Sequence, residues 1–149
     1  MKALTKRSLP AVAALILMLV IQSSASAPVL PNPVLYFLGQ EYLTINGKQI
    51  TRYSFDVLNK DDYPAELFAA SPNLPPCGKN ANSARTWVDI YDQAGKRLNG
   101  FCALGKPADL HGIWFSLDTD VIPPSWVYIE MNDRKTNTKY KSNLADTTL

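Results

Sequence analysis

The chain has 149 residues, and without the signal peptide predicted below about 124 remain, a length that suits one domain with a real core and falls well short of two. It carries 15 basic and 13 acidic residues, but three of the basic ones, Lys2, Lys6 and Arg7, lie in the first seven positions. The charges of the remaining 12 basic and 13 acidic residues nearly cancel. This balance excludes the class of proteins that bind nucleic acid through a large positive net charge.

The N-terminus has the three-part layout of a secretory signal peptide. A basic start is followed by an unbroken apolar run over residues 11–21 and by small residues over 23–27. The apolar run is too short to span a bilayer, and no cysteine follows it closely for a lipid anchor. We expect cleavage after Ala25 rather than Ala27, because Pro28 fits a peptidase poorly. The sequence therefore predicts a secreted or periplasmic protein with no membrane attachment after cleavage.

Four segments follow from this prediction. They are a signal peptide over 1–25, a proline-rich extended leader over 26–33, a folded domain over 34–143 and a disordered tail over 144–149.

The first part of the folded domain is predicted to form a β-hairpin. Residues 34–44 are rich in aromatic and branched side chains, Asn46-Gly47 is a strong turn signal, and residues 49–58 return. Apolar and polar side chains alternate in the return strand, which predicts one core face and one wet face. Residues 64–70 suit either a short helix or an irregular edge strand.

A second hairpin is closed by the only two cysteines. Residues 85–91 and 96–104 read as strands on either side of a turn, after a proline-rich loop over 71–82. Export makes a Cys77–Cys102 disulfide the expected state, with two free buried thiols as the alternative. A bond closing this 25-position loop stabilises the fold by about 3 to 4 kcal/mol in the chain-entropy model.

Three more strands are predicted over residues 113–118, 126–131 and 138–143. The last is flanked by lysines, as is common for edge strands that avoid further pairing. Short strands with turn signals between them predict an all-β fold, an antiparallel β-sandwich with one disulfide and either one short helix or none. This layout is similar to that of immunoglobulin-like and fibronectin type III-like modules. It departs from immunoglobulin domains at Cys77, which lies in a loop, so we interpret the disulfide as a loop clamp.

No pattern of residues indicates catalysis, and we expect neither an enzyme nor a cofactor. His111 is the only histidine, which leaves a histidine-based metal site without a second ligand. A hydrolytic arrangement of His111, Asp109 and a nearby serine has no nucleophile motif to support it. Asp118 and Asp120 lack the spacing of a calcium loop.

The remaining candidate for function is a set of aromatic side chains. If the apolar phase of each strand faces the core, five large rings lie on the outside. They are Trp87, Tyr91, Trp114, Trp126 and Tyr128. The alternative is that these rings are covered or belong to the core. The sequence thus predicts a non-catalytic secreted module that binds a protein, in an interaction or adhesion role, and does not identify the ligand. Glycan binding through the rings is the alternative, and a small hydrolase or inhibitor is the third candidate.

Overall fold

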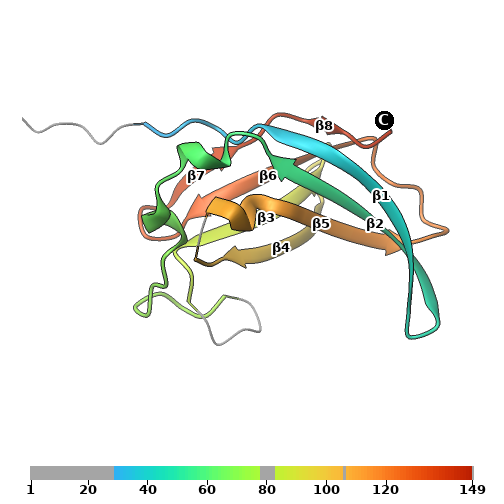
Figure 1. Ribbon diagram of the computed structural model, residues 1–149, viewed down its shortest axis with the longest axis horizontal. Helices are drawn as coiled ribbons and strands as arrows, with labels where there is room; N and C mark the ends of the chain where they lie inside the picture. Colours follow the sequence, from blue (N-terminus) through green and yellow to red (C-terminus); the bar gives the residue numbers. More distant parts are fainter. Residues whose placement is uncertain (1–28, 78–82, 106, 149) are drawn as a thin grey trace, which may run out of the picture.

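The structure is a computed structural model that describes residues 29–77, 83–105 and 107–148. The predicted signal peptide lies outside the described residues. Within them, eight strands form two antiparallel sheets that pack face to face (Figure 1). The strands are β1 (Leu35–Ile45), β2 (Lys48–Val57), β3 (Thr86–Asp92), β4 (Arg97–Ala103), β5 (His111–Asp118), β6 (Trp126–Asp133), β7 (Thr138–Lys141) and β8 (Ala145–Asp146). Three short 3-10 helices accompany them, η1 (Lys60–Asp62), η2 (Ala65–Phe68) and η3 (Pro107–Leu110).

The two sheets differ in size and in strand order. The smaller sheet has the order β1-β2-β5, and the larger has the order β4-β3-β6-β7, with β8 also paired to β6. Contacts between β1 and β8 and between β4 and β5 show which edges of the two sheets lie over each other. The predicted all-β antiparallel sandwich is confirmed.

The core lies between the sheets and consists of the apolar phase of each strand. Phe55 and Phe115 come from the smaller sheet, with ring centroids 5.9 Å apart, and Val88 and Ile129 come from the larger. All four are fully buried or nearly so. Each such side chain contributes about 1.5–3 kcal/mol relative to exposure in water. The period of two seen in the sequence therefore maps directly onto this core.

One segment differs from the sequence-based expectation, and the structure decides a second one that the sequence left open. The predicted tail over 144–149 is not a loose end, because Ala145 is buried and pairs with Val127 of β6. The Thr147 N–H also donates to the carbonyl of Ser125 at 3.0 Å. Alternating buried residues in so short a segment carry too little signal to be recognised as a strand. The ambiguous segment over 64–70 forms the short helix η2, which buries Leu67 and Phe68.

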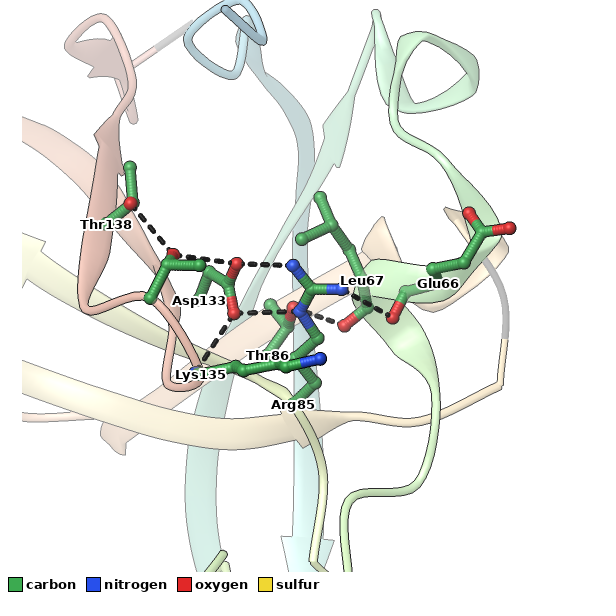
Figure 2. Close-up of polar contacts among 8 residues, drawn as sticks. Glu66, Leu67, Arg85, Thr86, Asp133, Lys135 and Thr138 are labelled. Carbon is green, nitrogen blue, oxygen red and sulfur yellow. Dashed lines mark hydrogen bonds and ion pairs between the residues drawn. The ribbon is translucent and has the colours of Figure 1, made fainter. Parts of the chain in front are cut away.

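A polar cluster ties η2 to the ends of β3 and β6 (Figure 2). Arg85 donates from Nε to Asp133 Oδ1 at 2.8 Å and from Nη2 to Asp133 Oδ2 at 2.7 Å. Thr86 Oγ1 donates to the carbonyl of Leu67 at 2.5 Å, and Thr136 Oγ1 donates to Asp133 Oδ2 at 2.8 Å. Burial opposes ionisation of Asp133, but these donors outweigh it and lower the pKa of this carboxyl to about 2.

Candidate functional site

The five predicted rings lie on the outer faces of the sandwich, but on two different sheets. Trp87 and Tyr91 belong to β3, and Trp126 and Tyr128 belong to β6, so these four share the larger sheet. Trp114 belongs to β5 in the smaller sheet. The core positions that alternate with the five rings are at most 2% exposed, which confirms the predicted phase of the strands. Their role in binding stays a prediction.

Neighbouring side chains occupy the faces of most of these rings. Tyr91 and Tyr128 stack on each other with centroids 5.3 Å apart, and Lys141 Nζ lies 4.0 Å from the centroid of Tyr128. Arg97 lies over Trp87 at 5.6 Å. Such cation–π contacts take up ring surface that a sugar needs for stacking. The rings therefore do not form one flat platform.

Trp114 lines a cleft between the facing edges of β4 and β5. The cleft has a volume of about 390 Å³. Its other lining residues are Asn99, Gly100, Phe101, Asp109, Gly112 and Ile113. Arg52 covers part of the Trp114 ring at 5.0 Å, yet 44% of the residue stays exposed. The Asn99 side chain donates to the carbonyl of Trp114 at 2.8 Å and joins the two edges.

His111 is paired with a different acid from the one considered in the sequence. Its Nδ1 lies 3.1 Å from Asp56 Oδ2, on the neighbouring strand β2, and its side chain is mostly exposed. Burial opposes ionisation of Asp56, but hydrogen bonds from His111 and Lys60 outweigh it and keep the pKa of this carboxyl below its usual value. No hydrogen bond joins His111 to a hydroxyl in the part of the chain that the structure describes. Asp118, which lacks the spacing of a calcium loop, pairs with Lys48 Nζ at 2.8 Å.

The disulfide is a loop clamp, as predicted. Cys102 lies in β4 opposite Trp87, and Cys77 lies in the loop that precedes β3. Their Cα atoms are 5.9 Å apart. The bond thus holds this loop against the outer side of the larger sheet instead of joining the two sheets.

A further surface, which the sequence did not point to, is the outer edge of β1. This strand has 11 residues and forms one end of the smaller sheet, so no other described strand pairs with its far side. It contains neither lysine nor proline, the residues that commonly prevent edge strands from pairing. By contrast, β7, an end strand of the larger sheet, has four residues and two of them are lysines.

Backbone groups along the second half of β1 point away from the sheet. In an antiparallel pair, residues bonded to the neighbour alternate with residues whose N–H and C=O face outward. The Asn143 side chain accepts from Leu35 N–H at 2.8 Å and donates to Leu35 C=O at 3.0 Å, so Leu35 belongs to the outward set. The irregularity at Leu38 shifts this alternation by one residue. Past it, the outward set is Gln40, Tyr42 and Thr44.

Apolar side chains accompany these outward backbone groups. Tyr42 is 70% exposed, and Leu38 and Ile45 are about half exposed. Towards the start of the strand, residues 35–39 and residues 143–146 line a groove of about 360 Å³. We call the outer side of residues 38–45 the β1 edge. In the sequence, the β1 edge is marked only by a long apolar strand that contains neither lysine nor proline. The order of the strands in the sheet is needed to show that this strand is an edge.

Comparison of the chain with protein-family models, with curated proteins and with solved structures found no match. Among the described residues, no helix has the length and apolar character needed to cross a membrane.

Proposed function

We propose that the protein is a non-catalytic, exported binding module that takes up an extended segment of a partner protein along the β1 edge. The observation that carries this proposal is the position of β1, an 11-residue strand at the end of its sheet with exposed apolar side chains and no lysine or proline. Strand addition of this kind uses backbone hydrogen bonds for affinity and side-chain contacts for specificity.

The chemistry of the β1 edge restricts the partner segment. Its central side chains, Leu38 and Tyr42, favour apolar residues at alternating positions of an added strand. The one charged residue of β1, Glu41, already pairs with Arg52 Nη1 at 3.0 Å. An uncharged, strand-forming segment therefore fits better than a strongly basic or acidic one.

A test of the proposal blocks the backbone and the side chains separately. Gln40→Pro removes an outward N–H without touching the ladder to β2, and Tyr42→Lys adds the charge that edge strands usually carry. A photo-crosslinking residue at position 42 first identifies the partner in the native compartment. Binding of the purified partner is then measured with each variant, and Thr138→Lys on the β7 edge serves as the control.

We expect both β1 variants to weaken binding at least tenfold while Thr138→Lys leaves it unchanged. Circular dichroism and thermal unfolding of all three should match the parent protein. Partner binding at parental affinity by both β1 variants, or equal crosslinking from position 139, would show that the β1 edge is not the binding surface.

Glycan binding is a second candidate, and the cleft beside Trp114 is the observation that favours it. A half-exposed indole, the Asp109 carboxylate and strand backbone groups together offer a stacking surface and polar contacts for a sugar. Intrinsic fluorescence during titration with a panel of oligosaccharides tests it, with Trp114→Ala against Trp126→Ala as the matched pair. A spectrum that stays unshifted across the panel argues against this function.

A further inference from the structure

The Cys77–Cys102 bond has a chemical environment that a merely structural clamp does not need. Cys77 is only 3% exposed, and its sulfur is in contact with two hydrogen-bond donors. Arg134 Nη1 lies 3.0 Å from Cys77 Sγ, and the N–H of Ala84 lies 3.4 Å from the same sulfur. A guanidinium and a backbone N–H are the groups that stabilise a thiolate and lower the pKa of a cysteine.

The guanidinium is held in place independently of the sulfur. Arg134 also donates from Nη1 to the carbonyl of Ala84 at 2.9 Å and from Nη2 to the carbonyl of Pro75 at 2.7 Å. Within the described residues, no carboxylate lies within ion-pair distance of Arg134. Its positive charge is therefore directed at Cys77 without a competing acid.

The two sulfurs differ in access. Cys77 is buried, whereas Cys102 is half-buried on the outer face of β4, the end strand of its sheet. An external thiolate reaches the more exposed sulfur first, and the sulfur with the stabilised thiolate is the better leaving group. Both properties select the same direction of reaction, with attack at Cys102 and departure of Cys77.

We propose that the Cys77–Cys102 disulfide is an exchangeable redox site that reacts with low-molecular-mass thiols at Cys102. In the first step, the external thiolate forms a bond to Cys102 Sγ, the Cys77–Cys102 bond breaks, and its electron pair leaves on Cys77 Sγ as a thiolate. The product is a mixed disulfide on Cys102, with the Cys77 thiolate beside Arg134. A second thiolate then attacks the sulfur of the external group in the mixed disulfide, which releases the external disulfide and leaves both cysteines reduced.

The test uses the full mature chain in its oxidised form, equilibrated in buffers of reduced and oxidised glutathione. The fraction reduced is quantified by mass spectrometry after alkylation. We expect Arg134→Met to lower the equilibrium constant for reduction at least tenfold, which corresponds to a potential about 30 mV more negative for a two-electron couple. Arg134→Lys keeps the charge, so its equilibrium constant for reduction should lie between those of the parent protein and Arg134→Met. Arg97→Met, which removes another guanidinium beside the same sheet, should behave as the parent protein.

Two further measurements keep the proposal falsifiable if Arg134→Met fails to fold. Peptide mapping should place the glutathione adduct on Cys102 and the alkylating label on Cys77. In the reduced parent protein, the rate of alkylation against pH should give a Cys77 pKa below the ordinary thiol value of about 8.5. An unchanged equilibrium constant in Arg134→Met, an adduct on Cys77, or a Cys77 pKa at or above that value would each overturn the proposal.

Discussion

Arg85 and Asp133, 48 positions apart in the chain, meet side by side through two parallel hydrogen bonds of 2.8 and 2.7 Å. Arg85 immediately precedes β3 and Asp133 ends β6, so the pair joins the start of one central strand to the end of its neighbour. The same carboxylate accepts from the Lys135 N–H at 3.1 Å and from Thr136 Oγ1 at 2.8 Å. These hydrogen-bond donors stabilise the charged form of the Asp133 carboxylate at the junction of β3 and β6.

The low pKa of Asp133 predicts a specific loss of stability in acid. Its folded pKa of about 2 lies below the unfolded value of 3.8, so the stabilisation is complete above about pH 4 and disappears as the pH falls through 2. We expect this group to account for roughly 1–2 kcal/mol after solvent screening. Urea unfolding between pH 5 and 2 should show a steeper loss in the parent protein than in Asp133→Asn. A control variant at the exposed Asp61, Asp61→Asn, should follow the parent curve, and equal slopes for all three would contradict the prediction.

Thr86→Val should destabilise the fold although it conserves side-chain shape. Thr86 is fully buried and its hydroxyl donates to the carbonyl of Leu67, so the variant leaves that carbonyl without its donor. The expected loss in the free energy of unfolding is about 1–2 kcal/mol. Thr44→Val on the exposed β1 edge is the matched control and should stay within about 0.5 kcal/mol of the parent. A neutral result for Thr86→Val in urea unfolding would mean that the bond contributes no net stability.

Asn143 should hold the first residues of β1 in their ordered strand conformation. Its side chain bonds both the N–H and the C=O of Leu35, as a neighbouring strand would. We expect Asn143→Ala to cost about 1 kcal/mol and to accelerate hydrogen exchange at the Leu35 amide. Asn143→Asp keeps only the acceptor, so its stability and its exchange rate at Leu35 should lie between those of the parent protein and Asn143→Ala. The comparison variant Asn73→Ala, in an exposed loop, should not change Leu35 exchange, and an unchanged rate in Asn143→Ala would exclude this role.

Removing both cysteines should lower stability without abolishing the sandwich. Cys77 and Cys102 close a loop of 25 positions, for which the chain-entropy model predicts about 3 to 4 kcal/mol. The core side chains that join the sheets make no use of the bond, so Cys77→Ala combined with Cys102→Ala should keep its strand content. Urea midpoints of the double variant and of the oxidised parent measure the difference. Identical midpoints would show that the clamp does not constrain the unfolded chain.

Much of the fold is readable in the sequence because it depends on local periodicity. Alternation along residues 85–91 and 126–131 identified both the strands and their core faces, and Asn46-Gly47 marked the turn between β1 and β2. The pairing of the only two cysteines followed from their number and from the predicted export. The short strand β8 was missed because two residues cannot display a period.

The candidate sites could not be predicted in the same way, because they depend on which strands become neighbours. Alternation shows that Leu38 and Tyr42 belong to a strand, but only the order β1-β2-β5 leaves that strand at the end of a sheet. Arg134 approaches Cys77 across 57 positions only because Pro75 and Cys77 lie beside the residue that follows β6. The sequence by itself determined the strands other than β8, their inward faces and the clamp, since each follows from the spacing of residue types along the chain. The tertiary structure alone decided the open edge, the cleft and the charged surroundings of the sulfur, since long-range contacts are set by the packing of the two sheets as a whole.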